Sequence, residues 1–243
     1  GISRYKLGQH AIDYIVNGNN IDICMSRMQL AGELPPAFAG KASAEILSLE
    51  VKNFLPYIGN SEKMPDIVFS KNIEQHLFSG KLQNSFEKGH VTCKVAKLNP
   101  KHLIAAWLEH LALCLCEEEL PETSLTTRVF TFDKNVEFKR LNSIEAMKIL
   151  HSLINVYIFG TENCIPFYLN SSHERAAKNK PLTAACTSWS GSSFGNITNA
   201  GDSEDEYISI LWKEENPFDK VPESFEYFSS LFWRPCLEHM EEF

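Results

Sequence analysis

The sequence contains no long apolar run, no paired-cysteine motif and no nucleotide-binding loop. No stretch approaches the ~18 uninterrupted apolar residues that a membrane-spanning helix needs, so we expect no membrane contact. No CxxC pair occurs, which argues against a structural zinc site. No GxxxxGK[ST] loop occurs either, which excludes ATP hydrolysis of the P-loop type. On these grounds we expect neither a cofactor nor a bound metal ion.

Basic residues are few. The 243 residues include 23 Lys and Arg against 31 Asp and Glu, which gives a formal charge of −8. A stand-alone DNA-binding protein normally has a basic excess, so any DNA contact has to come from a local patch. The seven cysteines are odd in number and irregularly spaced, and the first residues contain no apolar signal core. This pattern favours free thiols in a reducing, cytoplasmic compartment.

Hydrophobic periodicity predicts helices first and a group of short strands after them. Apolar residues at helical spacing predict helices over 4–17, 20–31 and 41–58, and Gly18 is placed to end the first. From Asp66 onward, short β-prone segments separated by Gly80 and Gly89 predict an antiparallel meander over 66–95. The segment 101–116 is apolar almost all the way round, which is typical of a helix buried between two layers.

The second half alternates strands and helices less regularly. We expect a strand pair at 127–132 and 136–138, then a helix over 143–159 that Gly160 ends. A solvated loop over 186–206, a strand over 207–212 and a final aromatic helix follow. This order predicts an α/β sheet covered by helices. We expect one domain over 1–243, with a helical part at about 1–60, a sheet core at about 64–175 and a C-terminal loop and helix at about 180–243.

Two short motifs have both a catalytic and a structural interpretation. Residues 191–195 match GxSxG around Ser193, with Asp219 and His239 following in the order of a serine hydrolase, but the surroundings are those of a Ser/Gly-rich surface loop. His110 and Cys114, four residues apart with His102 upstream, have the spacing of a metal-binding pair. The apolar helix around them favours a hydrogen-bonded core histidine instead.

The segment 88–101 is the only locally basic one. It has no carboxylate, and the next carboxylate along the chain is Glu109. It contains His90 and four lysines: Lys88, Lys94, Lys97 and Lys101. These lysines are candidates for contact with DNA phosphates. The alternative is a solvated strand edge on which lysines discourage edge-to-edge pairing. The acidic runs 117–119 and 202–206 are predicted to be solvated surfaces.

Aromatic residues are concentrated near the end of the chain, beyond what one amphipathic helix needs for its own core. Aromatic side chains are favoured at protein–protein interfaces as well as in cores. Four of them are candidates for contact with another subunit: Phe225, Phe228, Phe232 and Trp233.

Several sequence blocks together resemble the carboxy-terminal domain of the exodeoxyribonuclease V gamma subunit, RecC. The most specific block is AAWLEHLALC at 105–114. The others are ISRYKL at 2–7, LAGELPP at 30–36, YISILW at 207–212 and FWRP at 232–235. Since these blocks extend from the first residues to the last, the resemblance covers essentially the whole chain.

The resemblance implies a restriction-endonuclease-like, PD-(D/E)XK fold similar to the nuclease domain of RecB: a mixed sheet flanked by helices. Active nucleases of this type hold divalent metals with an Asp on one strand, an Asp-x-Lys on the next and an upstream His. The matching positions here are Gln83, Thr92 and Lys94, and no histidine occurs between residues 11 and 75. An amide and a hydroxyl are poor substitutes for two carboxylates as ligands of Mg²⁺. The catalytic residues are therefore expected to be lost.

The resemblance also implies a function and partners. We expect a non-catalytic module of the RecBCD helicase–nuclease, which contacts RecB and RecD and helps to guide double-stranded and single-stranded DNA during break repair and recombination. The alternative is a metal-dependent nuclease whose ligands have moved, for which Glu74 and Glu87 are the nearest carboxylates.

Overall fold

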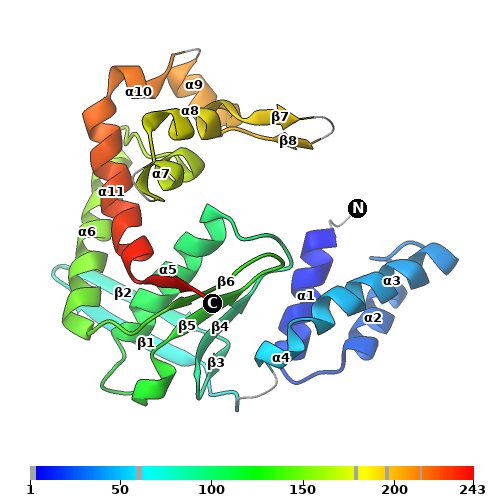
Figure 1. Ribbon diagram of the computed structural model, residues 1–243. Helices are drawn as coiled ribbons and strands as arrows, with labels where there is room; N and C mark the ends of the chain where they lie inside the picture. The colour runs from blue at the N-terminus through cyan, green and yellow to red at the C-terminus, as the bar shows by residue number, and fades with distance from the viewer. Residues whose placement is uncertain (1–3, 59–61, 178–179, 195–196, 214) are drawn as a thin grey trace. The chain divides into compact units, whose positions relative to one another are not determined.

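The chain forms two compact units in the computed structural model, which describes residues 4–58, 62–177, 180–194, 197–213 and 215–243 (Figure 1). Unit 1 comprises Gly1–Asn72, Leu77–Ser143 and Glu241–Phe243, and unit 2 comprises Ile73–His76 and Ile144–Met240. The single domain expected over 1–243 stays a prediction. No helix in the described part of the chain is both long and apolar enough to cross a bilayer.

Unit 1 begins with four helices: α1 (Arg4–Val16), α2 (Ile21–Leu30), α3 (Ala37–Lys52) and α4 (Leu55–Ile58). The first two confirm the predictions for 4–17 and 20–31. Gly18, at φ +78°, ends α1 in the left-handed conformation that glycine adopts without strain. The helix predicted over 41–58 starts earlier, at Ala37, and is interrupted after Lys52, so that α4 is a separate turn.

The sheet of unit 1 has five strands in the order β3–β4–β5–β6–β9. Their bounds are β3 (Ser85–Phe86), β4 (Gly89–Cys93), β5 (Thr127–Phe130), β6 (Asn135–Phe138) and β9 (Met240–Glu242). β4 pairs with β5 in parallel, with His90 opposite Thr127, whereas β3 pairs with β4 and β5 with β6 in antiparallel fashion. The sheet is thus mixed and flanked by helices, as predicted at the level of fold class.

The antiparallel pairing predicted within 66–95 is confirmed for β3 and β4, but a single meander is wrong. β1 (Ile67–Ile73) and β2 (His76–Leu82) form a two-stranded sheet of their own, and β4 belongs to the larger sheet. In that larger sheet, α5 (Pro100–Cys114) connects β4 to β5. A helical crossover brings the chain back in the same direction, so the two strands it joins are parallel.

Each face of the five-stranded sheet is covered by helices. On one face, Val91, Cys93 and Phe130 belong to the same hydrophobic core as the helices α1–α4. On the other face, Trp107 of α5 packs on Phe138 of β6 with ring centroids 5.3 Å apart. The far side of α5 packs against the β1–β2 hairpin, in a core that joins Phe69 to Leu113. The prediction of a helix buried between layers is therefore confirmed.

Unit 2 is mainly helical. Its elements are α6 (Ser143–Glu162), α7 (Leu169–Ala176), α8 (Leu182–Ser190), β7 (Ser192–Phe194), β8 (Ile197–Asn199), α9 (Glu206–Trp212), α10 (Pro217–Lys220) and α11 (Pro222–Glu238). Tyr168, Trp189, Phe218 and Phe225 form the centre of its core, together with Ala185. The final aromatic helix is confirmed as α11.

Three predictions for this region are wrong. The helix predicted to end at Gly160 continues to Glu162. Gly160 allows close packing inside the helix rather than ending it, since a Cβ there would lie 2.6 Å from the Cδ1 of Ile165. The predicted strand over 207–212 is the helix α9, since the Asp205 carboxylate accepts hydrogen bonds from the first amides of that helix, those of Tyr207 (3.0 Å) and Ile208 (3.2 Å).

The predicted solvated loop over 186–206 contains the end of α8, the β7–β8 hairpin and a short 3-10 helix, Asp202–Glu204. Within the acidic run 202–206, Asp202 is buried. Its carboxylate accepts hydrogen bonds from the amide and Oγ of Ser171, both at 2.7 Å, and from Nδ2 of Asn170 at 2.9 Å. This aspartate therefore caps the N-terminus of α7 from a distant part of the sequence.

Candidate functional site

Alternation along β4 sends its polar side chains toward α5 and its apolar side chains toward α1–α4. His90 and Thr92 lie on the α5 side, whereas Val91 and Cys93 belong to the core with α1–α4. The pairing with β5 continues past the end of the strand, because the Lys94 amide donates to the Phe130 carbonyl at 2.9 Å. Thr92 and Lys94, two residues apart, therefore occupy successive positions on the same side of the sheet.

Glu109 of α5 meets this polar side of β4. Its Oε2 lies 3.1 Å from Nε2 of His90 and accepts a hydrogen bond from Oγ1 of Thr92 at 3.2 Å. Burial by itself would raise the pKa of the Glu109 carboxyl, but the hydrogen bonds from His90 and Thr92 and the charge of Lys94 outweigh it, so the pKa is lowered. The three side chains form what we call the β4–α5 cluster: His90, Thr92 and Glu109.

Gln83 lies just outside the pairing of β3 with β4. The Val91 amide donates to the carbonyl oxygen of Asn84 at 3.1 Å, which extends the β3–β4 pairing by one residue. Gln83, the next residue along, is exposed. Among the residues that the structure describes, no group of three or more His, Cys, Asp or Glu is arranged to hold a metal ion.

The basic segment is divided by β4. Lys94, Lys97 and Lys101 follow the strand and lead into the first turn of α5, whereas Lys88 precedes it. Five residues of strand at about 3.3 Å each separate the two groups of lysines by roughly 16 Å. Within the described ranges, no carboxylate lies within 4.0 Å of the Nζ atoms of the three lysines that follow β4. His102 adds no charge beside them, because burial and the charge of Lys94 lower its pKa.

The two carboxylates that we considered as displaced metal ligands belong to different units. Glu87 is exposed and precedes β4, at the end of the strand that is remote from Lys94. Glu74 belongs to unit 2 and pairs with His151 at 3.1 Å. Glu109 was overlooked as a site residue. Its partners on β4 are 17 and 19 residues away, and local sequence pattern does not report contacts over such a separation.

His110 is a core histidine, as the structural interpretation predicted. Its Nε2 lies 2.9 Å from the Lys139 carbonyl oxygen and its Nδ1 lies 3.0 Å from Oγ1 of Thr127. Because a carbonyl can only accept, Nε2–H donates to it and the Thr127 hydroxyl donates to Nδ1. Burial raises the pKa of the neighbouring Cys114 thiol to about 11. Both groups are therefore committed to the fold rather than arranged as metal ligands.

Ser193 lies on β7, where it pairs with Thr198 in the β7–β8 hairpin. A nucleophile elbow requires a sharp turn from a strand into a helix, and this hairpin is a different structure. Nδ1–H of His239 donates to the Pro235 carbonyl oxygen of the preceding helical turn at 2.8 Å. The local geometry gives the hydrolase alternative no support.

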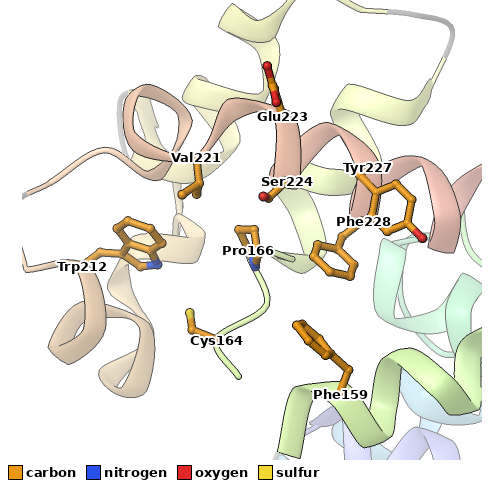
Figure 2. Close-up of a pocket in the computed structure, with 9 residues that line it drawn as sticks. All are labelled: Phe159, Cys164, Pro166, Trp212, Val221, Glu223, Ser224, Tyr227 and Phe228. Atoms are coloured by element: carbon orange, nitrogen blue, oxygen red, sulfur yellow. The ribbon is translucent and has the colours of Figure 1, made fainter. Parts of the chain in front are cut away.

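A second candidate site is the aromatic groove of unit 2, a cavity of about 530 Å³ (Figure 2). Phe159 of α6 and Phe228 of α11 face each other across it with ring centroids 6.4 Å apart. Trp212 closes one end, and the ring of Tyr227, which is 60% exposed, extends beside Phe228. Exposed aromatic surface of this kind is typical of protein interfaces.

The four predicted interface residues divide into two groups. Phe225 and Trp233 are completely buried in unit 2, so they offer no surface to another subunit, contrary to the prediction. Phe228 lines the aromatic groove, and Phe232 is half-buried against Phe167 at 4.3 Å. The helical repeat could have shown this division, because the buried positions of α11 recur every three to four residues.

Comparison with known proteins identifies one family. The family model described as the RecC C-terminal domain matches residues 1–180, which include unit 1 up to β6 and the first helices of unit 2. Two of the resembling blocks, at 207–212 and 232–235, lie outside the matched residues. A search of curated proteins finds no match. Since the family model covers well over half of the sequence, the chain belongs to the RecC C-terminal domain family.

Proposed function

We propose that this chain is a non-catalytic structural and DNA-guiding module of the RecBCD helicase–nuclease, exodeoxyribonuclease V, in double-strand break repair and recombination. Membership of the RecC C-terminal domain family supports a place in that complex. Its partners there are RecB, RecD and the DNA that the complex processes. The proposed location is the cytoplasm.

The observation that carries the non-catalytic part of this proposal is the β4–α5 cluster. We propose a restriction-endonuclease-like fold in which Gln83 and Thr92 replace the metal-binding carboxylates. In support, Thr92 uses its hydroxyl to hold Glu109 rather than to face solvent. That single carboxylate is also engaged by His90. Two-metal catalysis needs several charged oxygen ligands around one site, and this cluster supplies only one.

The DNA-guiding part rests on the three lysines that follow β4. Lys94, Lys97 and Lys101 are close in sequence around the loop that joins the strand to α5, and none has a carboxylate partner in the described residues. Each lysine that contacts a phosphate releases counterions, so the contact is recognised by its salt dependence. Lys88, at the other end of the strand, is not included in this group.

The test replaces the three lysines together, Lys94→Ala, Lys97→Ala and Lys101→Ala, in the assembled complex. The matched control replaces Lys71, Lys134 and Lys139, which pair with Glu119, Glu242 and Glu241 at 2.6–2.9 Å. We expect the first set to weaken binding to duplex ends and to make the plot of log K against log salt shallower by about 0.9 per lost phosphate contact. An unchanged slope, equal to that of the control set, would contradict the proposed contact.

A displaced-ligand nuclease is the second candidate function, and the position of Glu109 favours it. This carboxylate is adjacent to Thr92 and within electrostatic reach of Lys94. Glu109→Gln, which removes the charge and keeps the shape, separates the two functions. If the module is non-catalytic, we expect both Glu109→Gln and the control Glu87→Gln to leave metal-dependent cleavage of linear DNA by the complex at the wild-type rate. Loss of cleavage with Glu109→Gln alone would favour the nuclease.

A further inference from the structure

A small cavity lies on the α1–α4 side of the sheet, opposite the face that carries the β4–α5 cluster. It encloses about 250 Å³, and both aromatic and cationic side chains line it. The residues on which the following argument depends are Tyr57, Phe86, Lys88, Arg128, Phe130 and Phe243. Neither part of the proposed function uses this cavity.

The floor of the cavity is apolar and its mouth is aromatic. Phe86 and Phe130 are buried and close the bottom. The Tyr57 ring stacks on Phe130 with centroids 4.2 Å apart and an interplanar angle of 12°. Phe130 thus covers one face of the Tyr57 ring, and Tyr57 is 42% exposed. Phe243 stands edge-on to Phe130 at 83° and is 60% exposed.

Two cations border these rings. Lys88, which comes just before β4, is exposed, and Arg128 of β5 has its guanidinium held by a hydrogen bond to the Lys88 carbonyl oxygen. The Glu137 carboxylate lies 3.7 Å from Nε of Arg128. Two cationic side chains, of Lys88 and Arg128, therefore border the cavity. The sheet thus holds an exposed aromatic ring next to two cationic groups.

We propose that this cavity binds one nucleotide of a single-stranded nucleic acid, with the base on the face of Tyr57 that is opposite Phe130 and the phosphate near Lys88 and Arg128. Proteins that bind single strands combine a positive groove with aromatic rings on which bases stack. The cavity is smaller than the ~300–1,000 Å³ of sites for drug-sized ligands, a size that suits a single base. This inference rests on the proposed function and adds a single-strand contact to it.

The test uses the assembled complex and an oligothymidylate strand. Tyr57→Leu removes the ring but keeps an apolar side chain over Phe130, whereas Tyr57→Phe keeps the ring. We expect the first variant to weaken single-strand binding about tenfold and the second to match wild type, since stacking on an aromatic side chain is worth a factor of this order. Lys88→Gln should make the salt dependence shallower by about 0.7 in log–log slope. The control is Phe38→Leu, at an exposed ring of α3.

A crosslinking experiment distinguishes this cavity from other single-strand sites in the complex. A strand with 5-iodouracil should crosslink to Tyr57 or Phe243 on irradiation, and mass spectrometry identifies the modified peptide. No crosslink at either residue, together with wild-type affinity of Tyr57→Leu, would overturn the inference. Impaired capture of partner subunits by Tyr57→Leu, with single-strand affinity unchanged, would assign the cavity to a protein interface and also overturn it.

The two proposals fail separately. The lysines after β4 are tested with duplex ends, and Tyr57 is tested with a single strand. If Tyr57→Leu has no effect while the Lys94, Lys97 and Lys101 set weakens duplex binding, only the cavity inference is wrong. If the lysine set has no effect while Tyr57→Leu weakens single-strand binding, the proposed duplex contact is wrong and the cavity inference stands.

Discussion

Glu109 is the residue whose environment says most about the β4–α5 cluster. It is the only carboxylate on α5, and its side chain is 44% exposed. Its Oε2 receives hydrogen bonds from two residues of the same strand, His90 and Thr92. The cluster thus ties the middle of α5 to the polar side of β4, and its contribution to stability depends on the carboxylate being charged.

We predict that Glu109→Gln lowers the free energy of unfolding by about 1 kcal/mol at pH 7. Hydrogen bonds to a charged group are worth about 1.5–3 kcal/mol, and we reduce this value because the side chain is partly solvated. The pKa of Glu109 is lower in the folded protein than the ~4.3 of an unfolded chain, so its contribution is complete above that pH and is lost as the pH falls through the folded pKa.

The measurement is urea unfolding of both proteins from pH 7 to pH 3. The difference in stability between wild type and Glu109→Gln should stay constant down to about pH 5 and then shrink toward zero. A difference that persists unchanged at pH 3 would show that the carboxylate charge plays no part. Glu118→Gln, in the acidic run after α5, is a suitable control.

At the residue scale, the resemblance pointed to Gln83, Thr92 and Lys94 as the positions of lost catalytic residues, which stays a prediction. It did not indicate the partner of Thr92, which is Glu109. Glu109 was missed because its contact with His90 spans 19 residues across a crossover, a distance that local pattern does not report. The same limit applies to Arg128 and Tyr57, which only the folded sheet brings together.

At the scale of elements, helix α7 depends on a side chain that is far away in sequence. The carboxylate of Asp202 satisfies the first amides of α7, a role normally filled by the residue just before the helix. Tyr168, which precedes the helix, makes no such side-chain cap. The 3-10 helix that carries Asp202 is thereby attached to α7.

Asp202→Ala should therefore destabilise unit 2 by about 2 kcal/mol, since it removes a charged cap and leaves the Ser171 hydroxyl buried without its acceptor. Hydrogen exchange followed by mass spectrometry should show faster exchange of the amides of α7. The charge-matched control is Asp219→Ala, an exposed aspartate of α10. Equal exchange in α7 for both variants would contradict this role of Asp202.

Elements were predicted well where periodicity was strong and poorly where polar residues decided the structure. The helices α1, α2, α5 and α11 follow their apolar stripes. The segment 207–212 alternates like a strand, but Asp205 supplies an N-cap and no residue of the resulting helix is buried. The Ser/Gly-rich region 186–206 contains ordered elements because Asp202 ties it to α7.

For the whole molecule, the aromatic groove belongs to unit 2, and the lysines proposed to guide DNA belong to unit 1. We propose that the aromatic groove binds a partner subunit through Tyr227 and Phe228. Both side chains are accessible, in contrast to Phe225 and Trp233. A few aromatic residues generally dominate the affinity of such interfaces.

The double variant Tyr227→Ser, Phe228→Ser should weaken capture of separately expressed RecB or RecD by at least about tenfold, because aromatic anchors of interfaces are commonly worth more than 1 kcal/mol each. Tyr207→Ser, at an exposed ring of α9 outside the groove, is the control. Thermal unfolding of both variants checks that the fold is retained. Capture at the wild-type level would remove the groove from the proposed interface.

The path of the chain through the sheet has a consequence for how unit 2 is attached. The chain enters unit 2 after β6 and returns to unit 1 at β9, and these two strands are neighbours in the sheet. The Phe243 amide at the far end of β9 donates to the Asn135 carbonyl at the start of β6, so the chain departs and returns at the same end of the strand pair. In topological terms, most of unit 2 is an insertion into a hairpin. Insertions at such sites can change in length or be exchanged while the strands on either side keep their pairing.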